Sequence, residues 1–180
     1  MDEQQEQPVL PSETVSQRMS RPIYFPVSPL KLVVMATCTF GLYEVYWFYR
    51  HWGFVRERQN SDIVPFARAF FAVLFCYSLF KRIRTTGVSC NISGSIAPGP
   101  LAAGWIVFTI LARLPDPFWL ATFLAVLFLV PVQMAANEIN LASSPTHDSN
   151  SKFSGWNIAG VVIGGPLFVL ALVGTLLPPK

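Results

Sequence analysis

The sequence has few charged residues and few of the side chains that carry chemistry. Lys, Arg, Asp and Glu make up 13% of its 180 residues, against about 25% in soluble domains. There are two histidines, and the three cysteines show no C-x-x-C spacing, which argues against a disulfide framework and against a zinc site. A G-x-G-x-x-G, a P-loop and an H-E-x-x-H motif are also missing. We therefore expect a protein that is not an enzyme and that needs no cofactor or metal.

What the chain does have is apolar side chains, which make up 52% of the sequence. One small soluble core cannot hide this much apolar surface, so the excess is expected to face lipid or another protein. The net charge of +3 is weak, and the basic residues flank the apolar runs. This pattern is typical of membrane segments rather than of the basic face of a nucleic-acid-binding protein. We expect an integral membrane protein that does not bind nucleic acid.

Five apolar segments predict the architecture. Residues 1–27 are polar and acidic from the start, unlike a signal peptide, and we interpret them as a disordered tail. Residues 28–180 then form a transmembrane helical domain, since about 20 helical residues span a bilayer. The prediction is an all-α bundle with four to five crossings. The apolar segments cover residues 30–52, 63–84, 101–112, 118–136 and 156–177.

Two features of this arrangement stay open. The second segment has a short apolar stretch, so it either crosses the bilayer or lies in its interface. Leu114-Pro115-Asp116-Pro117 predicts a tight turn, so the third and fourth segments should form an antiparallel hairpin. Residues 85–100 and 137–152 are expected to be loops.

The basic residues do not fix the orientation. If all five segments cross, seven Lys and Arg residues lie on one side of the bilayer and six on the other. If the first segment is re-entrant instead, the split becomes nine against four. Cytoplasmic loops carry the excess of Lys and Arg. Because the tail has no export signal, we expect a cytoplasmic N-terminus in the plasma membrane.

Glu44 is the main candidate for a functional residue, because it lies within the first apolar segment. A charge in lipid costs about 2.5–3.5 kcal/mol on insertion scales, so such a residue should face the bundle or water. On one continuous helix, Thr37, Gly41, Glu44 and His51 fall on a single stripe. Glu44 is then either a proton or cation site lining a cavity, or a structural ion pair with another helix, or a hydrated side chain near the interface. We expect the protein to act through helix packing and through lipid or partner contacts, and the alternative is a transporter or channel subunit that uses Glu44 as its proton or cation site. The candidate ion-pair partners are Arg68, Lys81 and Arg113.

Other residues suggest packing rather than chemistry. His51 and His147 have no metal-site spacing, and both are expected to titrate in water. Gly160 and Gly164 form a G-x-x-x-G in the last segment, a spacing that lets another helix approach closely. The partner helix belongs either to the same chain or to a second copy or another membrane protein. We interpret the Lys and Arg flanks as anchors to anionic lipid headgroups rather than as a specific lipid site.

Residues 39–49, Thr-Phe-Gly-Leu-Tyr-Glu-Val-Tyr-Trp-Phe-Tyr, resemble the signature of a family of small bacterial multi-pass membrane proteins whose function is unknown. The family motif is similar to T-(F/L)-G-(L/I)-Y-x-x-Y-W-(F/L)-Y. Less specific similarities occur at residues 70–83, 114–117 and 153–157. The resemblance implies the bacterial inner membrane as the location and implies no activity.

Overall fold

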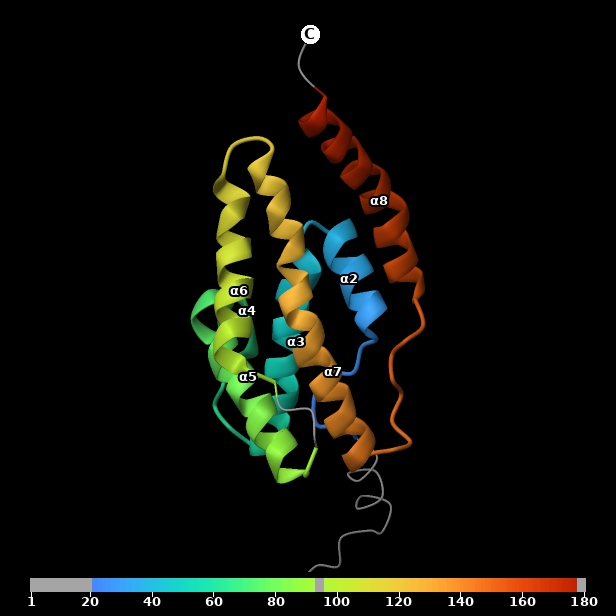
Figure 1. Ribbon diagram of the computed structural model, residues 1–180. Helices are drawn as coiled ribbons and strands as arrows, with labels where there is room; N and C mark the ends of the chain where they lie inside the picture. Colours follow the sequence, from blue (N-terminus) through green and yellow to red (C-terminus); the bar gives the residue numbers. More distant parts are fainter. Residues whose placement is uncertain (1–20, 93–95, 178–180) are drawn as a thin grey trace, which may run out of the picture.

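The helices follow one another without any strand in the part of the chain that the computed structural model describes, residues 21–92 and 96–177. This confirms the all-α prediction (Figure 1). The elements are α2 (Pro29–Cys38), α3 (Leu42–Gln59), α4 (Pro65–Phe70), α5 (Ala72–Ser89), α6 (Pro98–Ile110), η1 (Leu111–Arg113), η2 (Phe118–Leu124), α7 (Val126–Ser143) and α8 (Gly155–Leu176).

The first apolar segment is not one helix, because the chain reverses at Gly41. Gly41 has φ 84°, in the left-handed region, and its N–H donates to the carbonyl of Ala36 at 2.9 Å. Glycine adopts this conformation without the penalty that a Cβ imposes. α2 and α3 therefore form a short hairpin, and the prediction of one continuous helix over residues 30–52 is wrong (Figure 1).

The second apolar segment also breaks, at Phe71, which separates α4 from α5. α4 packs against α3. α5 then returns beside α3, so that Phe48 stacks on Phe80 and Arg82 donates to Gln59 at 2.8 Å. The segment thus forms a second hairpin of a six-residue helix and an 18-residue helix. It also runs five residues beyond the predicted end at residue 84, into the expected loop.

The third and fourth segments form the predicted antiparallel hairpin. α6 and η1 run up to the turn at residues 114–117, and η2 and α7 return beside them (Figure 1). The helices approach closely at Gly104, where an added Cβ would overlap the ring of Phe128. α7 continues to Ser143, seven residues past the predicted end at residue 136.

Two of the described helical stretches are long and apolar enough to cross a membrane, namely Phe118–Ser143 and Gly155–Leu176. They suggest a membrane-associated protein. The predicted four to five crossings are not supported, because the breaks at Gly41 and Phe71 leave helices too short or too polar for that test and α6 has only 13 residues. The last segment matches its prediction to within a residue at each end.

Residues 21–27, the N-terminal segment, were predicted to belong to the disordered tail but are packed in the core. Ile23, Tyr24, Phe25 and Val27 are all buried. They lie along α7, whose side-chain amides pair with the backbone of this extended segment. Residues 1–20 of the predicted tail lie outside the described residues.

The pairing uses four polar side chains at helical spacing, three of them on α7 and the fourth on Ser144, which directly follows α7. Gln133 Nε2 donates to the carbonyl of Phe25 at 3.1 Å, and Asn137 Nδ2 donates to that of Val27 at 2.9 Å. Asn140 exchanges two bonds of 2.9 Å with the N–H and carbonyl of Tyr24. Ser144 Oγ donates to the carbonyl of Arg21 at 2.9 Å. These bonds provide partners for backbone N–H and carbonyl groups of a buried segment that has no strand partner among the described residues.

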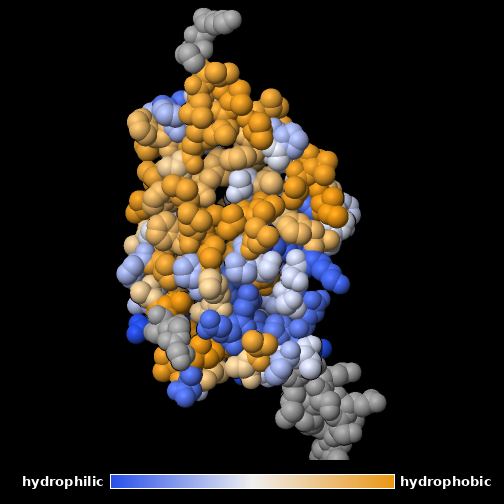
Figure 2. Space-filling model, turned by 45° about the vertical axis from the view of Figure 1, so that its right-hand side comes forward, coloured by the Kyte–Doolittle hydropathy of each residue, from blue (hydrophilic) through white to orange (hydrophobic). Residues whose placement is uncertain are grey.

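Basic residues gather at one end of the molecule, which we call the basic end. It contains the N-terminal segment, the turn at residues 60–64, the C-terminal end of α5 and the loop at residues 144–154 (Figure 1). Figure 2 shows hydrophilic residues grouped toward this end and hydrophobic residues covering the part near the end of α8. Arg113 ends η1, next to the turn at residues 114–117, and this turn lies at the opposite end (Figure 1).

Candidate functional site

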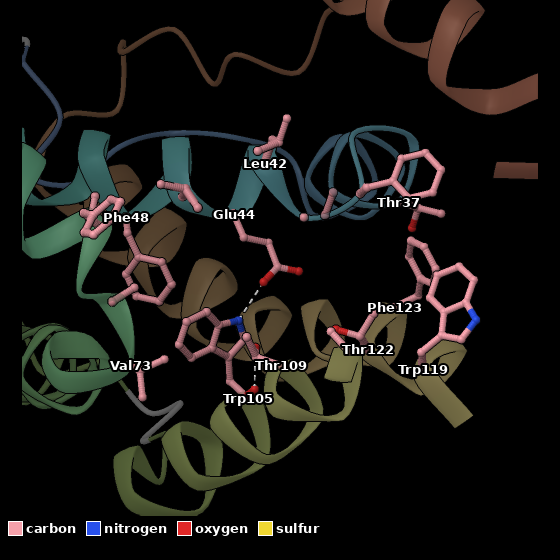
Figure 3. A pocket seen from close by; sticks show the side chains of 18 residues that line it. Thr37, Leu42, Glu44, Phe48, Val73, Trp105, Thr109, Trp119, Thr122 and Phe123 are labelled. Atoms are coloured by element: carbon pink, nitrogen blue, oxygen red, sulfur yellow. Dashed lines mark hydrogen bonds between the residues drawn. The ribbon is translucent and has the colours of Figure 1, made fainter. Parts of the chain in front are cut away.

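Glu44 is held by a hydrogen bond to the indole of Trp105. Its Oε2 atom accepts from Nε1 of Trp105 at 2.7 Å, across from α3 to α6 (Figure 3). Glu44 is 8% exposed, and Trp105 is also buried. Within residues 21–92 and 96–177, no basic side chain forms an ion pair with it. An ion pair with Arg68, Lys81 or Arg113 was one of three expected arrangements, and the structure places a neutral donor there instead.

The carboxyl faces a cavity of about 420 Å³, which we call the Glu44 cavity. Its polar groups are the Glu44 carboxyl and the hydroxyls of Thr37, Thr109 and Thr122 (Figure 3). The remaining wall is apolar or aromatic. The lining aromatic residues are Phe40, Phe48, Phe70, Trp105, Trp119 and Phe123. A mostly apolar cavity with a few polar groups is typical of a small-molecule site.

Both hairpin turns form part of the cavity wall. The α2–α3 turn contributes Phe40 and Gly41, and the α4–α5 break contributes Phe70 and Ala72. Glu44 lies in the first turn of α3, just after the turn at Gly41. The two breaks that shorten the apolar segments are therefore the features that create the site.

Thr37, Gly41 and Glu44 come together as predicted, but the reason differs from the predicted stripe. Thr37 belongs to α2, Gly41 to the turn and Glu44 to α3. They converge on the cavity because the chain folds back, and not because they share one helical face. His51, the fourth member of the stripe, lies outside this cavity.

His51 is fully buried, so the expectation that it titrates in water is wrong. Its Nε2 atom lies 3.1 Å from Oε1 of Gln133, which also accepts from Nε1 of Trp47 at 2.6 Å. The ring packs against Trp47 with 4.1 Å between centroids. His51 is thus part of the core that joins α3, α7 and the N-terminal segment.

Arg68 is also separate from Glu44. Its guanidinium lies over the ring of Trp52 at 4.3 Å and over the ring of Phe75 at 5.2 Å. Such stacking stabilises a cation on an aromatic face. The geometry assigns Arg68 to packing between α3, α4 and α5.

Gly160 and Gly164 face α2 of the same chain. An added Cβ on Gly164 would overlap the carbonyl oxygen of Cys38, and one on Gly160 would lie 3.4 Å from Cε of Met35. The expected partners were a helix of the same chain, a second copy or another membrane protein. The structure shows the first of these, with the backbones of α2 and α8 in close contact.

Sequence reasoning missed Trp105, Thr109 and Thr122, which complete the site. A Trp in the middle of an apolar helix, with an indole N–H that needs a partner, was the available signal for Trp105. It also missed Gln133, because nothing in one sequence shows which backbone a buried amide meets.

No protein-family model, curated protein or solved structure matches this chain. The resemblance of residues 39–49 to a bacterial membrane family therefore stays a prediction. In the described part of the chain, no three His, Cys, Asp or Glu side chains lie close enough to hold a metal ion. The Glu44 cavity, with one acid and no second titratable partner on its wall, is the site that remains to be explained.

Proposed function

We propose that the protein is a non-enzymatic, multi-pass helical protein of the plasma membrane. In this arrangement α6 with η1, η2 with α7, and α8 pass through the bilayer, and the α2–α3 and α4–α5 hairpins enter it partway. The exposed surface of α8 supports this, since Gly164 is the only buried residue in its 22. A helix with this much exposed apolar surface requires lipid or a partner to cover it.

We further propose that the basic end faces the cytoplasm, with the N-terminus. The two partial hairpins return to the side from which they start, and this places their basic residues with those of the tail. That side then carries the basic residues of the N-terminal segment, of the C-terminal ends of α3 and α5 and of the loop at residues 144–154, whereas Arg113 lies on the other side. Such an excess favours a cytoplasmic position for that side.

We propose that the protein acts by binding, and that the Glu44 cavity takes a cation with an apolar body. The observation that carries this proposal is a buried carboxyl, bonded to Trp105 at 2.7 Å, on the wall of an otherwise apolar cavity. One carboxyl supplies one counter-charge. Aromatic faces around it favour a cation that has shed its water.

Transport is a second candidate function, favoured by the two hairpin turns that meet at the cavity. Transporters commonly form substrate sites from discontinuous helices in the bilayer. Under this proposal the protein moves the cation across the bilayer as well as binding it. Potential-driven uptake of the same cation into proteoliposomes distinguishes transport from binding.

The test of binding uses the full chain in liposomes and tetraphenylphosphonium as a lipophilic monocation. We expect saturable quenching of tryptophan fluorescence by the wild type, with about tenfold weaker binding in Glu44→Gln, the loss of roughly 1.4 kcal/mol. Glu138→Gln removes the same charge from an exposed position on α7 and serves as the control. Equal binding by all three proteins would refute the cation site.

The amount of protein in the membrane fraction distinguishes a binding role of Glu44 from a structural role. A binding residue should tolerate Glu44→Gln with unchanged insertion, because the amide still accepts from Trp105. A sharp loss of protein in the membrane fraction would instead assign Glu44 to structure.

A further inference from the structure

A second cavity lies at the basic end, between the N-terminal segment, α3 and α5. It has a volume of about 540 Å³, and we call it the Arg58–Lys81 cavity. Ile23 and Val55 form apolar parts of its wall, and Arg58, Lys81 and Arg82 bring three positive charges to it. It shares no lining residue with the Glu44 cavity.

These three cations have no acidic partner in the described part of the chain. Nη1 of Arg82 donates to the neutral Oε1 of Gln59 at 2.8 Å, and none of the three forms an ion pair there. Glu57 lines the adjacent hollow with Arg58, not this cavity. Three like charges around one cavity repel each other, and an anion between them relieves that repulsion.

Three of the four hydroxyls on the cavity wall are already engaged, which leaves the cations and the hydroxyl of Ser78 as donors for an anion. The hydroxyls of Tyr24 and Thr86 are 2.8 Å apart, and Thr86 donates to the carbonyl of Arg82 at 3.0 Å. Thr85 donates to the carbonyl of Lys81 at 2.9 Å. Burial raises the pKa of Tyr24, while the charges of Arg82 and Arg58 act in the opposite direction, which agrees with their closeness to the phenol.

An apolar track on α5 leads to the cavity. Leu74, Tyr77 and Lys81 follow one another at helical spacing, and Leu74 and Tyr77 are exposed. In the membrane placement proposed above, this face meets the acyl chains of the leaflet on the side of the basic end. A lipid lying along it has its headgroup beside Lys81.

We propose that the Arg58–Lys81 cavity binds the phosphate group of an anionic phospholipid, whose acyl chain follows Leu74 and Tyr77. A guanidinium and an ammonium suit phosphate oxygens, as charge-assisted donors. The proposal rests on the membrane placement and is independent of the Glu44 cavity. It differs from general anchoring because it assigns the lipid to particular cations.

The test measures phosphatidylglycerol binding to the full chain in detergent by native mass spectrometry, with phosphatidylcholine as the neutral lipid. Arg58→Gln/Lys81→Gln removes two cavity charges, one from α3 and one from α5. Arg56→Gln/Arg84→Gln removes two charges from the same helices outside the cavity. We expect about tenfold or greater weakening of phosphatidylglycerol binding in the first variant and little change in the second.

Three results would overturn the proposal. Equal weakening in both variants would mean general anchoring by charge. Equal binding of phosphatidylglycerol and phosphatidylcholine by the wild type would mean that no anion is recognised. Displacement of phosphatidylglycerol by an equimolar amount of glycerol phosphate would assign the cavity to a soluble phosphate. The membrane placement is tested separately by extraction with alkaline carbonate. Release of the wild type from vesicles would refute that placement.

Discussion

Nε1 of Trp105 donates to Oε2 of Glu44 at 2.7 Å, and this bond joins α6 to the first turn of α3. It gives a buried carboxyl its partner without neutralising it by a cation. The bond therefore fixes the position of the acid and leaves its charge available to whatever occupies the cavity. The proposed binding function requires both properties of Glu44, a fixed position and an available charge.

We predict that Trp105→Phe lowers stability by about 1–3 kcal/mol, because it leaves a buried acceptor unpaired while keeping most of the ring. Thermal unfolding in detergent, followed by circular dichroism, measures the loss. Trp119→Phe is the matched control, since its N–H bonds to Asp116 in an exposed pair. If both variants unfold at the same temperature, the Glu44 bond contributes no more than a surface contact.

Composition and periodicity were enough to predict the helices but not the places where they reverse. The hairpin at residues 114–117 carries two prolines, which exclude a continuous helix there. At Phe71 no such residue marks the break, and at Gly41 a single glycine is common in membrane helices. The reversals depend on packing of α2, α3, α4 and α5 against one another, which one sequence does not display.

The candidate site was also predictable only in part, because one sequence does not show which distant residues pack together. Glu44 stood out because an acid in an apolar segment is costly. Its partner did not, because Trp105 is 61 residues away and has no charge. His51 looked hydrated because Arg50 precedes it, yet α7 and the N-terminal segment bury it. Contacts that distant in sequence leave no local pattern.

Gly164→Ala should destabilise the packing of α8 on α2 by about 1–3 kcal/mol, the usual cost of overpacking. The new Cβ would overlap the carbonyl oxygen of Cys38, a backbone atom that moves only with α2. Gly164→Leu should have a larger effect. Gly165→Ala is the control, because a Cβ there meets nothing within 4 Å. An unchanged melting profile for Gly164→Leu in detergent would contradict the contact.

Gly41→Ala should cost about 1–2 kcal/mol, because the left-handed φ of 84° strains any residue with a Cβ. Space is not the reason, since a Cβ at Gly41 meets nothing within 4 Å. Gly53→Ala, in the interior of α3 and equally unhindered, should instead stabilise by about 0.5–1 kcal/mol. Thermal unfolding of the two variants should therefore shift in opposite directions. Stabilisation by both substitutions would mean that α2 and α3 are one continuous helix.

Asn140→Leu should release the N-terminal segment from α7. The substitution leaves the N–H and the carbonyl of Tyr24 unpaired in a buried position, at about 1–3 kcal/mol each. Hydrogen–deuterium exchange of the peptide covering residues 21–27 measures the release, and we expect its protection to fall far more than that of α8. Glu138→Ala, exposed on the same helix, controls for a general effect of substitutions in α7. If the segment keeps its protection in Asn140→Leu, then its apolar side chains alone hold it in place and the amide pairing is secondary.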